Sequence, residues 1–205
     1  MSNATLASES VSATKPVRRR PLPTLFDSSA LITAAKFRAQ GRLVIDHLLA
    51  CCRVSILPEV KREVVDVALR LGYGDAVDLR DRVEAGSIVV LSGAVREPGL
   101  ETALAALALE DTDRAVIHAA GQWPRLRPIA DDHRLFVTAT RLDLSPVCLP
   151  DLVACLAQTR RLSMDVAKAL LVAVGPRYAK GFVGLSQRRL EERTGNAEDS
   201  DPGVG

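Results

Sequence analysis

Short apolar runs alternate along this chain with longer segments of helical periodicity, and this alternation restricts the possible folds more than any other feature. Runs such as "SIVVL" are continuously apolar, which is typical of strands covered on both faces. Strands that alternate with helices favour a parallel sheet wrapped by helices. We therefore predict an α/β fold with three layers, α/β/α, around a central parallel sheet. The predicted strands are 24–26, 54–57, 88–91, 127–130 and 146–148.

Helical patterns fill the intervals between these runs and dominate the end of the chain. Pro150 begins a wholly helical region, in which Ser163 and Asp165 form a helix start signal. We predict a flexible arm over 1–20, an α/β domain over 21–149, a packed helical extension over 150–194 and a disordered tail over 195–205. The predicted helices are 29–49, 59–71, 74–85, 99–109, 112–121, 132–141, 150–159, 163–174 and 177–193.

Composition narrows the class of protein. The chain is 47% hydrophobic but only 3% aromatic, so its core must be built from Ala, Val, Leu and Ile. A net charge of +2 is too small to indicate a nucleic-acid partner by itself. No apolar run is long enough to cross a membrane, and the first residues do not form a secretory signal. The four cysteines match no zinc spacing, so we expect all four in the core of a cytoplasmic protein.

Carboxylates follow two of the predicted strands. Asp27 comes directly after 24–26, and Asp131 and Asp132 come after 127–130. An aspartate at a strand-to-helix junction is commonly a helix N-cap. Ligands of open parallel sheets, however, bind outside the carboxyl ends of the strands. Two acidic endings in one sheet therefore favour a functional site over two separate caps.

Two predicted helices add further acids near their first turns. Glu59 and Glu63 lie four residues apart on one helix, and Asp111 and Asp113 lie at the start of another. Carboxylates that converge without basic partners repel one another by an energy on the order of several kcal/mol. Such a cluster persists when it is protonated or holds cations, and its hard oxygen ligands suit Mg²⁺ or Mn²⁺.

At this point the sequence resembles the PIN-domain family, metal-dependent ribonucleases that include the VapC-type toxins. The resemblance covers about 22–147 and rests on four motifs: "LFDSSALI", "LPEVKREVV", "TDRAVIHAA" and "IADDHRL". It implies a Rossmann-like fold, a Mg²⁺ or Mn²⁺ cofactor and hydrolysis of RNA phosphodiester bonds. It also implies a toxin–antitoxin pair, with RNA as substrate and an inhibitory antitoxin protein as partner.

The same resemblance assigns roles to individual residues. Asp27 and Glu63 would be catalytic metal ligands, with Glu63 favoured over Glu59 by its spacing from Pro58. Ser28 would be the hydroxyl residue that contacts substrate. The third acid would be Asp113, with Asp111 as its rival, and the fourth would be Asp131 or Asp132. The chain departs from the family pattern at two positions: Ala130 stands where Thr or Ser is common before the fourth acid, and Glu110 stands where many relatives have Gly.

Other readings of the sequence remain open. A catalytically inactive PIN-like binding or regulatory module is the main alternative, and Ala130 is its best support. A helix-turn-helix in 159–174 is disfavoured, because its apolar positions resemble packing residues. The apolar helix after Asp27 leaves room for a homodimer or an inhibitor, although a buried core face is the simpler interpretation. No GxSxG, HExxH or P-loop motif suggests other chemistry.

Overall fold

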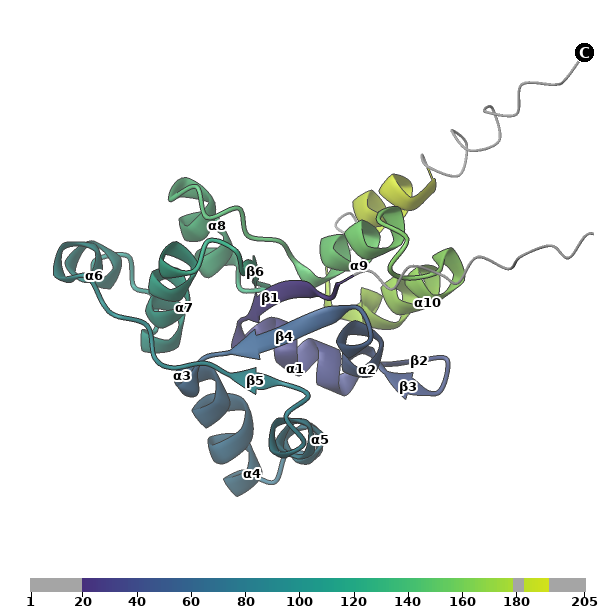
Figure 1. Ribbon diagram of the computed structural model, residues 1–205, viewed down its shortest axis with the longest axis horizontal. Helices are drawn as coiled ribbons and strands as arrows, with labels where there is room; N and C mark the ends of the chain where they lie inside the picture. Colours follow the sequence, from purple (N-terminus) through teal and green to yellow (C-terminus); the bar gives the residue numbers. More distant parts are fainter. Residues whose placement is uncertain (1–19, 179–182, 192–205) are drawn as a thin grey trace, which may run out of the picture.

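Four parallel strands form the central sheet of the protein, in the order β5-β4-β1-β6 (Figure 1). The structure is a computed structural model and describes residues 20–178 and 183–191. β1 (Leu22–Phe26) pairs with β4 (Cys52–Ile56) on one side and with β6 (Arg127–Ile129) on the other, and β5 (Val89–Val90) lies outside β4. The predicted α/β fold and its first four strands are confirmed. The fifth prediction, 146–148, is reduced to one parallel bridge between Val147 and Ile129.

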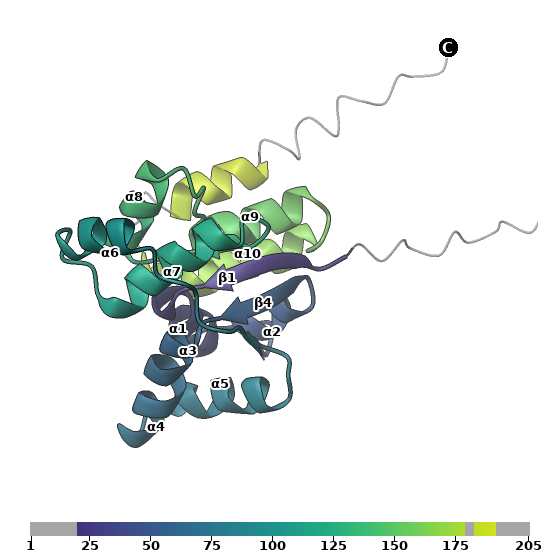
Figure 2. The same ribbon diagram turned by 60° about the vertical axis from the view of Figure 1, so that its left-hand side comes forward.

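Helices lie on both sides of this sheet. α1, α2 and α5 lie on one side, and α7 lies on the other (Figure 2). The segment predicted as one helix over 59–71 is helical from 58 to 70 but contains a π-helical turn, η1. The bounds are α1 (Ser28–Lys36), α2 (Val44–Leu49), α3 (Pro58–Lys61), η1 (Arg62–Val67), α4 (Ala68–Arg70), α5 (Gly74–Glu84), α6 (Pro98–Ala105), α7 (Asp111–Gln122), α8 (His133–Arg141), α9 (Leu149–Gln158), α10 (Met164–Val174) and the 3₁₀ turn η2 (Gly175–Arg177). Residues 183–191 are also helical.

The prediction of one helix over 29–49 is wrong. α1 ends at Lys36, and an antiparallel hairpin of β2 (Arg38–Ala39) and β3 (Arg42–Leu43) separates it from α2. Gln40 and Gly41 form the turn with φ of 49° and 78°. Two consecutive positive φ values suit the right-handed twist of a hairpin, and glycine adopts them without strain. Apolar residues have helical spacing on both sides of this break, so the sequence pattern does not indicate it.

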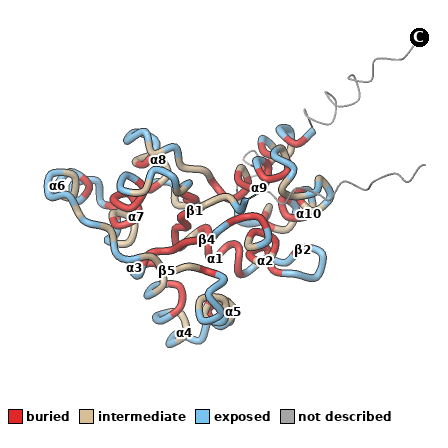
Figure 3. Tube along the Cα trace, viewed as in Figure 1, coloured by how far each residue is buried: buried red, intermediate tan, exposed pale blue. Residues whose placement is uncertain are grey.

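One buried cluster links the sheet to the C-terminal helices. The cluster includes Leu25 of β1, Leu31 of α1, Leu152 of α9 and Leu170 of α10. In Figure 3 the buried residues, drawn in red, lie mainly at the centre of the molecule. The apolar face of α1 is therefore used for packing within the chain. The buried residues of α10 agree with packing as well, and its predicted N-cap, Ser163, accepts a hydrogen bond from Val166 N–H at 3.3 Å.

Some predictions need correction or fall outside the described residues. Cys51, Cys52 and Cys148 are buried, but Cys155 is exposed because it lies on the outer face of α9. The predicted tail over 195–205, nearly all of the arm over 1–20, and parts of the helix over 177–193 lie outside the described residues. Among the residues that the structure describes, no helix has the length and apolar character needed to cross a bilayer.

The buried position of Leu31 generates a stability prediction. Its side chain has no exposed surface, so Leu31→Ala should lower the free energy of unfolding by about 2–5 kcal/mol through lost contacts and a residual cavity. Leu71→Ala is the matched control, because Leu71 is 64% exposed and its truncation should change stability by less than about 0.5 kcal/mol. Urea unfolding measures both, and equal losses in the two variants would contradict this packing.

Candidate functional site

Asp27 joins the first strand, the first helix and the loop after β6. Its backbone N–H donates to Ile129 O at 2.9 Å, which extends the pairing of β1 and β6. Its Oδ1 accepts the N–H of Ala30 at 2.7 Å, so Asp27 is the N-cap of α1. Its Oδ2 accepts the N–H groups of Asp131 and Asp132, at 3.1 and 3.4 Å. The capping role is therefore real, and the same carboxylate also holds the second acidic loop beside the first.

The environment of Asp27 opposes its negative charge. The residue is 2% exposed, and this burial, together with the nearby charge of Asp131, raises the pKa of Asp27 to about 7. The backbone N–H donors act in the opposite direction and lower the pKa, but burial outweighs them. A cation beside this carboxylate would favour its ionised form.

Ser28 connects the start of α1 to the helix that carries Glu63. Ser28 is buried, and its Oγ donates to Glu63 Oε2 at 2.7 Å. Glu63 is exposed and lies in the first turn of η1. Isolated π-helical turns occur frequently at functional sites, where the wider turn displaces a side chain from its α-helical position. The hydroxyl predicted to contact substrate is thus committed to orienting Glu63.

Asp113 lies in the first turn of α7 among other acids. Burial raises the pKa of Asp113 to about 6, and the charge of Asp132 is the next largest cause. Glu110 and Glu63 raise it further, while a hydrogen bond from the backbone N–H of Glu110 lowers it. Asp132 and Glu63 are therefore close enough to Asp113, at the carboxyl edge of the sheet, for their charges to raise its pKa.

Asp131 and Asp132 have different surroundings, although they are adjacent in sequence. Asp131 accepts the N–H of Leu149 at 3.0 Å through Oδ1 and the hydroxyl of Tyr178 through Oδ2. Asp132 caps α8 by accepting the N–H of Leu135 at 2.9 Å through Oδ1. Both oxygens of Asp131 thus hold other parts of the chain in place. Asp132 Oδ2 accepts no hydrogen bond from the described residues, so Asp132 is the freer ligand.

The rival acids Asp111 and Glu59 belong to a separate ion-pair network. Asp111 Oδ1 lies 2.6 Å from Arg96 Nη1 and 3.2 Å from Arg114 Nη2, and these arginines lower the pKa of Asp111. Glu59 Oε1 lies 3.9 Å from Arg96 Nη2. A carboxylate already neutralised by arginine is a poor candidate for a metal ligand. The geometry therefore favours Asp113 over Asp111. It does not separate Glu63 from Glu59 in this way, because the contact of Glu59 to Arg96 is long and its Oε2 is buried without a hydrogen-bond partner among the described residues.

The remaining acids of the candidate site form no such ion pair, although Asp131, whose pKa burial raises, lies near enough to Arg177 for that charge to lower the pKa in part. Within 20–178 and 183–191, no Lys, Arg or His nitrogen lies within the 4.0 Å ion-pair distance of any of them. Their side chains approach one another in pairs, and no three His, Cys, Asp or Glu side chains among these residues could hold an ion together as placed. Their oxygens suit Mg²⁺ or Mn²⁺, but a shared ion requires side-chain rotation. These acids are Asp27, Glu63, Asp113, Asp131 and Asp132.

A cavity of about 250 Å³ adjoins Asp131 and brings in residues that the sequence did not single out. Arg177, Tyr178 and His133 line it together with the ring of Phe136. Arg177 and Tyr178 are far from the acidic motifs along the chain, and 47 residues separate Tyr178 from its partner Asp131. No local pattern could have identified them.

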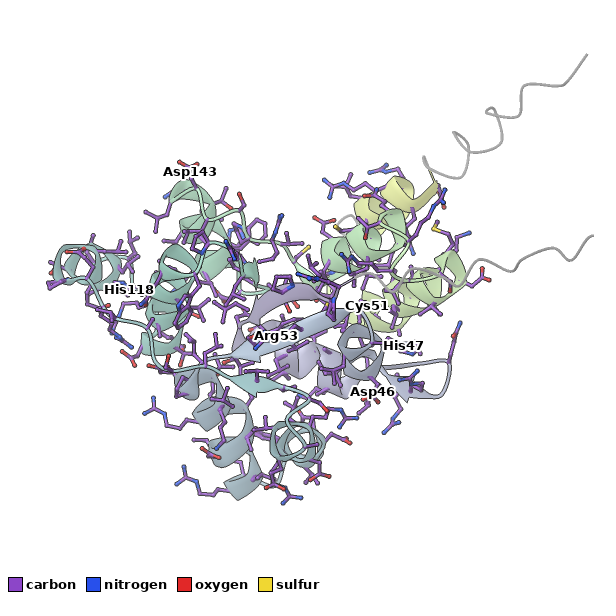
Figure 4. All side chains as sticks on the ribbon, in the orientation of Figure 1. Asp46, His47, Cys51, Arg53, His118 and Asp143 are labelled. Atoms are coloured by element: carbon purple, nitrogen blue, oxygen red, sulfur yellow. The ribbon has the colours of Figure 1, made fainter. Side chains whose placement is uncertain are left out.

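His118 is a packed residue, buried to 5% exposure on α7. Figure 4 labels it on α7, beside α6. Its Nε2 lies 3.0 Å from Glu101 Oε2, and its Nδ1 accepts the N–H of Glu97 at 3.4 Å. This histidine supports the ion-pair network around Arg96 and does not contact the acids of the candidate site.

The buried acids predict how stability depends on pH. Asp27 and Asp113 titrate near 7 and 6 in the folded chain but near 3.8 when unfolded. Between these values the folded state binds more protons, so the free energy of unfolding should fall as pH rises from about 4 to 7. Asp113→Asn, which retains an acceptor for the N–H of Glu110, should reduce the part of this slope below about pH 6.

Urea unfolding at a series of pH values, with a metal chelator present, measures this slope. Asp66→Asn is the matched control, since Asp66 is an exposed carboxylate paired with Lys61 and should leave the slope unchanged. A slope that is identical in wild type and Asp113→Asn would contradict the environment described for Asp113.

Comparisons with known proteins add no relative. No protein-family model, no curated protein and no solved structure matches the chain. The functional argument therefore rests on the fold, on the geometry of the acids and on the sequence motifs.

Proposed function

We propose that this chain is a metal-dependent endoribonuclease that hydrolyses RNA phosphodiester bonds with Mg²⁺ or Mn²⁺. One observation carries the proposal: carboxylates from the β1–α1 junction, η1, α7 and the β6–α8 loop lie near one another at the carboxyl edge of a parallel sheet, and none of them forms an ion pair with a described residue. Open α/β sheets bind their ligands at this edge.

Electrostatics support a cation at this position. The Asp27 carboxylate is buried, and the charge of Asp131 disfavours its ionised form further. Burial of an unpaired charge is costly, so the group is stabilised either by protonation or by a counter-ion. Raised pKa values at Asp27 and Asp113 agree with an excess of negative charge near neutral pH. Divalent ions with oxygen ligands would relieve it.

The surroundings of each acid suggest a role for it. Asp27, Glu63, Asp113 and Asp132 would hold the metal. A divalent ion held there would supply a water of lowered pKa as the nucleophile and stabilise charge on the phosphate. Asp131 would act as a positioning residue, because its carboxylate fastens the loop to the start of α9 and to Tyr178. This arrangement would keep Asp132 directed toward Asp113.

RNA as the substrate rests on the resemblance of the four acidic motifs to PIN-domain ribonucleases. The cavity beside Asp131 is compatible with a nucleotide, since Arg177 and His133 can contact phosphate and Phe136 offers a ring for a base. An antitoxin protein and a homodimer stay predictions from the sequence. Because α1 packs its apolar face into the core, either partner would need another surface.

A catalytically inactive binding or regulatory module is the second candidate. Two observations favour it: Ala130 replaces a residue that is commonly Thr or Ser in the family, and the described acids do not form a group of three in this arrangement. Cleavage assays separate the two candidates, because only the enzyme turns over its substrate.

Two isosteric variants test the enzyme. Glu63→Gln can still accept the Ser28 hydroxyl, and Asp113→Asn can still accept the Glu110 N–H, so both should fold while losing a ligand charge. Each should lower the rate of Mn²⁺-dependent cleavage of a fluorogenic single-stranded RNA by at least about 100-fold, beyond the range for loss of a supporting contact. Asp27→Asn is less suitable, since its amide nitrogen would face a backbone N–H.

Asp66→Asn is the control for these variants. Asp66→Asn removes the same charge, in the helical segment that carries Glu63, but Asp66 lies in an exposed pair with Lys61, and the rate of this variant should stay within twofold of wild type. Wild-type protein that cleaves no RNA with either metal, or variants as active as the control, would contradict the proposal. Metal binding without cleavage would instead favour the inactive module.

A further inference from the structure

A groove lies at the C-terminal end of α7, the helix whose first turn carries Asp113. Two adjoining hollows of about 440 and 350 Å³ form it, and Pro23, Arg125 and Leu126 line both. We call it the Trp123 groove, after the only tryptophan of the chain, which lines the larger hollow. Because α7 runs from the acids at its first turn to Trp123 at its C-cap, the groove and the acids lie at opposite ends of this helix.

The groove carries positive charge that no residue in the described part of the chain pairs with. Arg53 and Arg125 line the larger hollow, and Arg125 and Arg127 line the smaller one. All three residues are exposed, and Figure 4 labels Arg53 on β4. None of these guanidinium groups forms a hydrogen bond or an ion pair with any residue in 20–178 or 183–191. The one acid that lines either hollow among these residues is Asp143.

Apolar side chains alternate with these arginines. Trp123 is half-buried, and Pro23, Pro124 and Leu126 line the hollows beside it. Guanidinium groups bind phosphates through planar hydrogen bonds, and an indole ring offers a stacking surface for any base. A ligand with regularly spaced phosphates and accessible bases would satisfy both sets of side chains. A double helix would present its phosphates but hide its bases.

We infer that the Trp123 groove binds single-stranded nucleic acid through phosphate contacts to Arg53 and Arg125 and through stacking against Trp123. The site is separate from the acids, and its binding requires neither metal nor catalysis. In a nuclease it would hold a strand away from the point of cleavage. In a module without catalytic activity it would be a binding function in its own right.

The test uses the full chain with a metal chelator present, so that failure of the ribonuclease proposal does not affect it. A fluorescein-labelled oligouridine of about 12 nucleotides, within the range of single-strand binding sites, is titrated and followed by anisotropy. Trp123 fluorescence, excited where RNA absorbs little, should be quenched at the same concentrations. Because Trp123 is the only tryptophan, this signal reports on the groove alone.

Paired charge variants distinguish this groove from general attraction. Arg53→Gln combined with Arg125→Gln should weaken binding about tenfold or more, and should make the slope of log affinity against log salt less negative by about 1.4, or about 0.7 for each phosphate contact. The control combines Arg38→Gln on β2 with Arg70→Gln on α4, two exposed arginines outside the groove. It removes the same charge and should stay within twofold of wild type.

A third variant predicts a gain. Asp143→Asn removes the acid that lines the smaller hollow and should tighten binding by about two- to fivefold. Absence of wild-type binding, or equal losses in both paired variants, would overturn the inference. Polyglutamate that displaces the oligonucleotide and quenches Trp123 equally well would overturn it in favour of an acidic polypeptide partner.

Discussion

The Asp27 carboxylate is the contact on which the rest of the site depends. It accepts one N–H from the start of α1 and two from the loop after β6, whose residues lie 104 and 105 positions away in the sequence. One side chain thereby fixes the junction of two central strands and two helices. A carboxylate can satisfy donors on both sides, whereas an amide cannot. Because the junction needs a carboxylate to accept these N–H groups, it also contains a buried acidic side chain.

This burial has consequences for the neighbouring acids. Asp131 satisfies its own oxygens with Leu149 and Tyr178, and Asp132 caps α8, so each acid of the loop also has a structural task. Asp132 keeps one oxygen without a described partner, and Glu63 and Asp113, on other elements, each have a single hydrogen-bond partner. In this view the site consists of a rigid half, built by the backbone around Asp27, and an adjustable half from η1 and α7.

Charge is distributed unevenly over α7 and its surroundings. The unpaired acids lie at its first turn, while Arg53, Arg125 and Arg127 surround its last turn. The network of ion pairs that Arg96 and Arg114 form with Glu59, Glu101 and Asp111 contains charges of both signs. The protein therefore has an acidic region and a basic region, although its net charge is only +2. Whole-chain charge is a poor guide to partners when the charges are separated in this way.

Much of the fold could be predicted from local patterns, because a buried central strand such as β4 leaves a short, mostly apolar run. The run "SIVVL" also predicted a strand correctly, but β5 lies at the edge of the sheet and Val90 is exposed, so the prediction that it is covered on both faces is wrong. The hairpin at Gln40 and Gly41 could not be predicted, because the apolar residues on both sides of it keep the spacing of a helix. Glu63 and Asp113 are predicted as site residues by the resemblance of their motifs to PIN-domain proteins. The choice between Asp131 and Asp132, however, depends on Tyr178, and the exclusion of Asp111 depends on Arg96, 15 residues away. These distinctions depend on tertiary contacts, which local sequence patterns do not indicate.

The most direct measurement of the central claim is calorimetric titration of Mn²⁺ into the wild-type chain, Glu63→Gln, Asp113→Asn and Asp66→Asn, with thermal melts as a control for folding. A shared metal centre predicts saturable binding in wild type and Asp66→Asn, and binding weakened at least about tenfold in folded Glu63→Gln and Asp113→Asn. Wild-type protein that binds no Mn²⁺, or four proteins that bind it equally, would contradict the account. The acids would then be helix caps and loop anchors alone.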